Sequence, residues 1–109
     1  MATTAYLGEF EQLLLLAIVR LGPDATGGAI RQLVADCSQR VVWIGAVHTT
    51  LERLEAKGLV GWRVMPADDE HERARKTYSL RPAGQAAINR AYLTWMHMTQ
   101  GLKPRLEKP

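Results

Sequence analysis

The sequence predicts a mainly helical α+β domain in which three helices are followed by a β-hairpin and a fourth helix. Three observations support this fold class. Before Gly58, apolar residues recur at helical spacing in three separate segments. Directly after Gly58 the spacing becomes that of a strand, and after Pro82 it is helical again. The chain has 109 residues, a length that suffices for one small domain with a thin core, and its net charge is +3.

The first helix is predicted from about residue 8 to residue 21. One apolar stripe runs along it, formed by Phe10, Leu13, Leu14, Ala17, Ile18 and Leu21. Leu15, Leu16 and Val19 lie outside that stripe, so this helix is apolar nearly all round and needs cover on two sides. We expect a second subunit to supply the second cover. The run Gly22-Pro23-Asp24 ends the helix.

A second helix is predicted over residues 27–37, with Thr26 as its N-cap. Ile30, Leu33, Val34 and Cys37 form its buried stripe, which makes Cys37 a small core residue. As the only cysteine of the chain, Cys37 cannot form an intramolecular disulfide. Residues 41–43, with two valines and a tryptophan, favour an extended link and could add a small edge strand.

The third helix begins near Gly45 and ends at Gly58, whose left-handed conformation caps it. Val47, Leu51 and Leu54 share its buried face. The opposite face is small, polar and almost free of acid near its start, as suits a helix that enters a DNA major groove. The alternative is an ordinary solvent-exposed face.

A β-hairpin follows the third helix. Val60, Trp62 and Val64 alternate with other residues and predict a strand with one buried face, and residues 75–80 predict the returning strand. The intervening loop is acidic, with Asp68, Asp69, Glu70 and Glu72. Three helices and a hairpin form the winged helix-turn-helix arrangement, in which the hairpin is the wing.

The fourth helix is predicted from Pro82 to about residue 100, because proline suits the first position of a helix. It carries two apolar stripes, more than one thin domain can cover: Ile88, Tyr92, Trp95 and Thr99, and Ala87, Ala91, Met98 and Leu102. Residues 103–109 are predicted to be a disordered tail.

Several function classes are excluded. The three histidines, His48, His71 and His97, lie in separate elements without metal-ligand spacing, and no phosphate-binding loop or nucleophile motif is present. We therefore expect no enzyme, no cofactor and no metal. The longest apolar run is too short for a membrane span, and the N-terminus does not look like a secretion signal, so the cytoplasm is the expected location. Residues 1–40 carry a net charge of −1 and residues 41–109 carry +4, a difference that favours nucleic-acid binding by the second part.

Three blocks of the sequence, residues 7–18, 45–60 and 75–84, match a known family in order and spacing. The chain resembles the PadR family of bacterial transcriptional regulators, in particular its short members with a single C-terminal helix. The resemblance implies a winged helix-turn-helix DNA-binding domain over residues 1–81 and a dimerisation helix over residues 82–102. It also implies a homodimeric repressor of near-palindromic double-stranded DNA. His48 stands where the family usually has tyrosine, and the acidic wing tip is also unusual.

Residues on the third helix and at the base of the wing are the candidate DNA contacts: Gly45, His48, Thr49, Thr50, Arg53, Arg73, Arg75 and Lys76. Threonine can bond to phosphates or bases, and the cations mainly set affinity and its salt dependence. Each charged candidate has an alternative role. His48 could pack against the second helix, Arg53 could pair with neighbouring glutamates, and the wing cations could pair with the acidic loop.

The dimer interface is predicted to contain Phe10, Leu14, Leu15, Ile88, Tyr92, Trp95, Met96 and Thr99. Some members of the family sense flat aromatic compounds at this interface, and Trp95 and Tyr92 could stack such an effector. Alternatively, both side chains only fill the dimer core. A different function also fits the acidic wing and the modest net charge, namely a winged-helix protein–protein interaction module that does not bind DNA.

Overall fold

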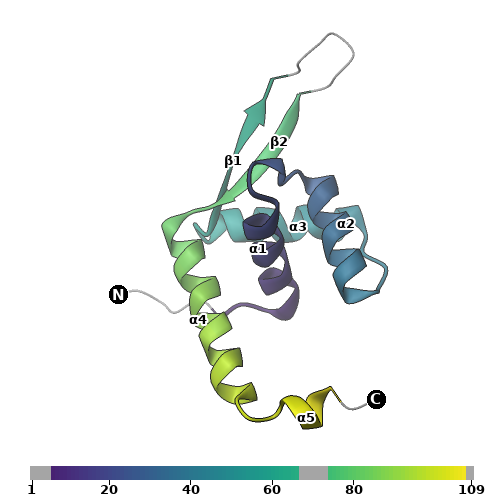
Figure 1. Ribbon diagram of the computed structural model, residues 1–109. Coiled ribbons are helices and arrows are strands. Elements are labelled where there is room, and N and C mark those ends of the chain that lie inside the picture. Colours follow the sequence, from purple (N-terminus) through teal and green to yellow (C-terminus); the bar gives the residue numbers. More distant parts are fainter. Residues whose placement is uncertain (1–5, 67–73, 108–109) are drawn as a thin grey trace.

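The computed structural model describes residues 6–66 and 74–107 of the chain. Helices α1 to α3, the two antiparallel strands and helix α4 follow one another in the predicted order (Figure 1). The elements are α1 (Glu9–Leu21), the 3-10 turn η1 (Gly22–Asp24), α2 (Gly27–Ser38), α3 (Ile44–Ala56), β1 (Val60–Met65), β2 (Arg75–Leu80), α4 (Pro82–Thr99) and α5 (Lys103–Leu106).

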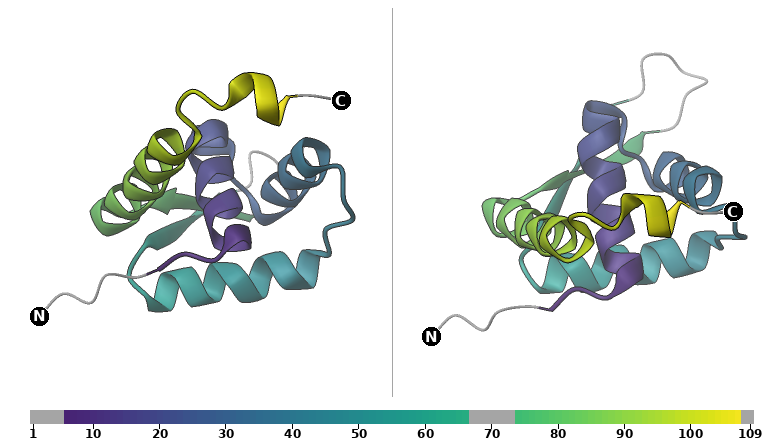
Figure 2. Two further views of the ribbon diagram at one scale, coloured as in Figure 1. Left: turned by 90° about the horizontal axis from the view of Figure 1, so that it is seen from below. Right: turned by 60° about the horizontal axis from the view of Figure 1, so that its bottom comes forward.

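Helix α1 is the central element, and α2, α3, α4 and strand β2 all pack against it. Figure 2 shows α3 on one side of α1 and the C-terminal part of the chain on the opposite side. The side chains that meet at α1 are apolar and fully or almost fully buried: Leu14, Leu15, Ile18, Ile30, Val47, Leu51 and Leu54. This core holds α3 with its inner face against α1 and leaves its outer face to solvent.

Local sequence signals set the ends of the helices where they are predicted. The Thr26 hydroxyl accepts a hydrogen bond from the Ala29 amide at 3.2 Å, so Thr26 caps α2. Gly58 has a φ of 76°, the left-handed conformation expected just after α3. Pro82 is the first residue of α4.

The wing is a two-stranded antiparallel sheet in which Val60 pairs with Leu80 and Met65 pairs with Arg75. Its predicted buried face is correct only at the base. Val60 is fully buried, but Trp62 and Val64 are 41% and 53% exposed, because the hairpin projects away from the body of the domain (Figure 1). The acidic loop residues Asp68, Asp69, Glu70 and Glu72 lie outside the described residues.

The edge strand predicted over residues 41–43 does not form, and this segment is an irregular link into α3. The extra strand contact comes instead from the η1–α2 connection. Thr26 forms an isolated bridge with Thr77, and the Tyr78 amide donates to the Ala25 carbonyl at 2.8 Å. The base of the wing is therefore attached to the start of α2.

Two further predictions are wrong. Cys37 is exposed rather than in the core, because the last turn of α2 brings it to an open groove between α1 and α2. Lys103–Leu106 form the short helix α5 where the sequence predicts a disordered tail. Pro104 lies at the start of α5, a position that proline favours, which explains the additional turn.

Candidate nucleic-acid interface

The outer face of α3 is exposed to solvent. Gly45, His48, Thr49 and Arg53 are all exposed on it. The first turn of α3 contains no acidic residue. Trp43, the N-cap residue, is 74% exposed at the edge of this surface and was not among the predicted contacts. The sequence signal for it was an aromatic residue directly before the predicted start of the helix.

Thr50 does not belong to this surface. Its side chain is 6% exposed, which corrects its assignment as a DNA contact. The reason is helical spacing, since Thr50 follows Val47 by three residues and therefore shares the buried face of α3.

His48 packs against α2, as the alternative role predicts. A Cβ atom at Gly27 would lie 2.9 Å from His48 Cε1, so the imidazole rests directly on the Gly27 backbone. Although in contact with α2, His48 remains exposed to solvent. The contact fixes the ring beside the N-terminus of α2.

Arg53 is exposed on the second half of α3. Within residues 6–66 and 74–107, neither Glu52 nor Glu55 forms an ion pair with it, so the alternative of pairing with these glutamates is not observed. Its positive charge is one of the factors that lower the pKa of Glu11 on α1.

One of the wing cations, Lys76, contacts an aromatic side chain. Lys76 Nζ lies 3.9 Å from the centroid of the Trp62 ring, a cation–π contact. Trp62 Nε1 in turn donates to Glu55 Oε2 on α3 at 3.0 Å. Arg75 is exposed, and Arg73 lies outside the described residues. The wing is therefore attached to α3 through Trp62, a link that the sequence pattern did not predict.

Tyr78 lies behind this link and is buried on β2. Its burial, together with the negative charges of Glu55 and Glu52, raises the pKa of its hydroxyl. The side chain therefore stays neutral at physiological pH and acts as part of the core.

The predicted effector residues are exposed on α4, with Trp95 at 56% and Tyr92 at 58%. Trp95 Nε1 donates to Gln12 Oε1 of α1 at 3.0 Å. Trp95 also lines a cavity of about 300 Å³ with Leu7, Gln12, Ala87 and Ala91, whereas Tyr92 does not line it. Within one chain, the two aromatic side chains therefore do not form a single pocket.

The predicted dimer residues divide into two groups. Tyr92, Trp95 and Met96 are exposed, and Phe10 and Thr99 are half-buried. Leu14, Leu15 and Ile88 are instead buried in the core of the same chain, where α1 meets α2, α3 and α4. They have no surface to offer a partner, which corrects their assignment. The exposed apolar residues missed by the prediction are Leu16, Val19, Leu93 and Met98.

No group of three histidine, cysteine or acidic side chains within the described residues is placed to hold a metal ion. In that same part of the chain, no helix combines the length and apolarity that a membrane-spanning segment needs.

No protein-family model and no curated protein matches this chain. Solved structures do match it. A PadR-like transcriptional regulator from Bacillus cereus is 15% identical, covers 92% of this chain and 93% of its own, and superposes with a TM-score of 0.73. A PadR family transcription regulator from Clostridium difficile R20291 is 20% identical over 91% of this chain and 99% of its own, with a TM-score of 0.71. MarR from E. coli is 19% identical over 86% of this chain and 65% of its own, with a TM-score of 0.60.

The chain therefore has the winged-helix fold of the PadR-like regulators, which confirms the predicted fold class and the resemblance in fold. Both of these neighbours are transcription regulators.

Proposed function

We propose that this chain is a PadR-like transcription repressor that binds near-palindromic operator DNA as a homodimer. The observation that carries the proposal is the outer face of α3, which is exposed, built from small and polar side chains, and free of acid in its first turn. A helix of this kind can approach the base edges of a major groove closely.

Each predicted contact other than the buried Thr50 has a role in this complex. Gly45 and Thr49 lie nearest the bases, where the threonine hydroxyl can bond to a base and its methyl group can meet thymine. His48, supported by Gly27, donates to a phosphate or to guanine. Arg53 and the wing residues Arg73, Arg75 and Lys76 bind phosphates, and Trp62 positions Lys76 for this contact.

Dimerisation through residues 82–102 would cover the apolar surface that one chain leaves exposed. Tyr92, Leu93, Trp95, Met96 and Met98 are all exposed on α4, and an apolar surface of this extent usually marks an interface. Two copies of α3 would then reach successive major-groove faces, and a near-palindromic operator follows from the symmetry.

A small aromatic effector would bind on Trp95 at this interface. It would relieve repression only if it bound the DNA-incompetent geometry of the dimer more tightly than the competent one. The protein would act in the cytoplasm.

Fluorescence anisotropy tests the proposal. The labelled duplex comes from immediately upstream of the gene for this protein, with a scrambled duplex for comparison. We expect preference for the native duplex and an affinity that falls by at least about a hundredfold between about 50 and 200 mM salt, because each subunit neutralises several phosphates. The double variant Thr49→Ala with Arg53→Ala should lose at least about a hundredfold in affinity, since a dimer carries each substitution twice.

Arg105→Ala is the matched control. It removes one arginine charge from α5, which lies on the other side of α1 from α3 (Figure 2), so it should leave operator binding nearly unchanged. Retention of sequence-specific binding by the α3 double variant would refute the assignment of the recognition helix. Absence of salt-sensitive binding to any duplex would instead favour a protein-interaction module.

A further inference from the structure

Three apolar side chains at the start of α3 are exposed although the backbone beside them is held in place. Val41, Trp43 and Ile44 are 76%, 74% and 43% exposed, and we call them the entry patch. Val42 lies between the first two and is buried, and its carbonyl oxygen accepts a hydrogen bond from Arg31 Nη1 at 3.5 Å. The fold therefore anchors this segment through Val42 and presents its neighbours to solvent.

Trp43 differs from the other two tryptophans of the chain. Trp62 Nε1 donates to Glu55 and Trp95 Nε1 donates to Gln12, so each of these indoles joins two elements of the fold. Among residues 6–66 and 74–107, no such hydrogen bond ties the Trp43 indole to another element. Within this part of the chain, its large ring is therefore available to another molecule.

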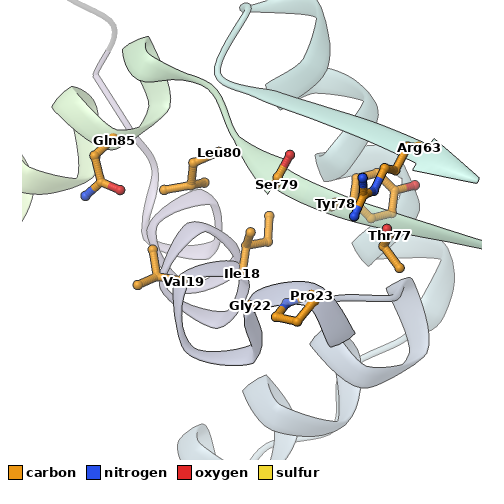
Figure 3. A pocket seen from close by; sticks show the side chains of 10 residues that line it. All are labelled: Ile18, Val19, Gly22, Pro23, Arg63, Thr77, Tyr78, Ser79, Leu80 and Gln85. Carbon is orange, nitrogen blue, oxygen red and sulfur yellow. The ribbon is translucent and has the colours of Figure 1, made fainter. Parts of the chain in front are cut away.

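The entry patch is not the wall of a cavity. None of its residues lines the cavity of about 510 Å³ around Arg63 at the base of the wing (Figure 3), the Trp95 cavity or the groove between α1 and α2. Small molecules bind in concave sites, so a patch outside these hollows suits a macromolecule. The α2–α3 connection also lies on the other side of the domain from α4 (Figures 1 and 2), which separates the entry patch from the apolar surface of α4.

The entry patch is continuous with the face of α3 assigned to DNA. Ile44 precedes His48 by four residues, one turn of the helix. Residues 37–51 include no acidic residue. Arg31, which holds the Val42 carbonyl, has no carboxylate within ion-pair distance in the part of the chain that the structure describes. The charges at this end of α3 therefore favour the approach of phosphates.

Gly45 leaves open space beside the entry patch. Its φ is not in the left-handed region, and nothing among the described residues lies within 4 Å of where its Cβ would be. Neither the backbone conformation nor this packing requires a glycine here. A glycine does allow another molecule to approach the backbone closely. In a docked complex, Trp43 and Ile44 would lie beside the point where α3 comes nearest to the bases.

The thymine methyl group is the apolar feature that base edges present in the major groove, and apolar side chains recognise it. We propose that the Trp43 ring covers the methyl group of one thymine in each half-site, while Val41 and Ile44 exclude water around it. This inference rests on the proposed operator complex. It makes Trp43 a specificity-determining residue and assigns it a base other than the one that Thr49 meets.

Selection of bound duplexes from a random pool, with the wild type and with Trp43→Ala, tests this assignment. We expect both proteins to select a near-palindrome. The wild type should require thymine at one symmetric pair of positions where Trp43→Ala accepts any base, and the other positions should agree. Leu106→Ala is the matched control, because it also removes an exposed apolar side chain, but from α5 on the other side of α1 from α3 (Figure 2). It should select the same sequence as the wild type.

Uracil in place of that thymine isolates the methyl group, because the two bases differ in nothing else. In fluorescence anisotropy the wild type should bind the uracil duplex about tenfold more weakly, since burial of one methyl group is worth about fourfold and the operator contains it twice. Trp43→Ala should bind both duplexes equally. Thr49→Ser lacks the other methyl group near the bases and should still prefer thymine at this position by about tenfold.

Two results would overturn the assignment of Trp43 and leave the repressor function standing. One is the same base preference at every position for the wild type and Trp43→Ala. The other is equal binding of the thymine and uracil duplexes by the wild type, a comparison that needs no variant. A uracil effect that persists in Trp43→Ala and disappears in Thr49→Ser would also overturn it, because the methyl group would then belong to Thr49. If the wild type selects no sequence at all, the proposed function is wrong together with this inference, and a protein partner becomes the occupant of the entry patch.

Discussion

A Gly84→Ala variant is expected to lose about 3 kcal/mol of its free energy of unfolding, because one methyl group would overlap a fixed backbone atom. Gly84 lies in the first turn of α4 and is buried. A Cβ atom placed there would collide with the carbonyl oxygen of Leu59 and lie 3.0 Å from its carbonyl carbon. No flexible side chain can move away to relieve this overlap.

The Leu59 backbone is held from both sides. Its carbonyl oxygen accepts a hydrogen bond from the Arg81 amide at 2.9 Å, and its amide donates to the Leu54 carbonyl at 3.0 Å. Leu59 itself is 4% exposed. To admit the methyl group, α4 must move away from the connection between α3 and β1, which breaks the Arg81 hydrogen bond and opens the core.

Thermal unfolding followed by circular dichroism, at one fixed protein concentration, measures this loss. For a domain of this size about 3 kcal/mol corresponds to a decrease in Tm of about 15 °C. Gly28→Ala is the matched control, since nothing lies within 4 Å of a Cβ atom there and the position is helical. It should change stability by no more than about 0.5 kcal/mol, and in the favourable direction. Equal Tm values for the two variants would show that α4 does not pack closely on Leu59.

The helix and strand boundaries could be predicted because local chemistry determines them. Thr26 caps α2 with its own side chain, Gly58 takes up a conformation that other residues avoid, and Pro82 starts α4. Each signal acts within one or two turns of chain, so the pattern of neighbouring residues was sufficient.

Which face of a helix is buried depends on distant parts of the chain, and the sequence predicted the buried faces less well than the helix boundaries. Leu15 was predicted to contact a partner because it lies outside the main stripe of α1, yet α1 is surrounded by α2, α3, α4 and β2. Leu16 and Val19 remain exposed on the same helix. The assignment of Thr50 as a DNA contact was wrong for a different reason, because its spacing from Val47 already indicated that it lies on the buried face of α3.

The candidate sites also differ in whether their residues are close in sequence or are brought together only by the fold. The exposed residues of α3 are close in sequence, and their spacing alone placed Gly45, His48, Thr49 and Arg53 on one surface. The cavity at Trp95 joins Leu7 and Gln12 to residues of α4, which no local spacing brings together. The ion pair between Glu11 and Lys57 likewise joins residues 46 positions apart.

That ion pair leads to the second expected result: Glu11→Gln should cost about 2 kcal/mol of unfolding free energy near neutral pH. Glu11 is 6% exposed. Its carboxylate accepts hydrogen bonds from Lys57 Nζ at 2.7 Å and from the Gly8 amide at 2.9 Å, so it joins the start of α1 to the end of α3. The amide of glutamine can still accept from Gly8 but loses the charge interaction with Lys57.

The cost should depend on pH in a defined direction. Burial raises the pKa of the Glu11 carboxyl, but the hydrogen bonds from Lys57 and Gly8 and the charges of Lys57 and Arg53 outweigh it, so the pKa lies below its ordinary value of 4.5. A group whose pKa is lower in the folded state stabilises the fold at pH values above its unfolded pKa. This contribution is lost as the pH falls from 4.5 through the lower folded-state value.

Urea denaturation of the wild type and the variant near neutral pH, and again at a pH below the ordinary carboxyl value, measures both effects. The difference between wild type and Glu11→Gln should shrink markedly in acid, where the wild-type carboxyl takes up its proton. Glu9→Gln is the matched control, because Glu9 lies in the same helical turn and pairs with Arg40 at 3.0 Å, but on the surface with 75% of its side chain exposed. An exposed pair contributes little, so this control should show a much smaller effect at both pH values. Equal losses in Glu9→Gln and Glu11→Gln, or a Glu11→Gln loss that does not change with pH, would show that the Glu11–Lys57 pair does not hold α1 to α3.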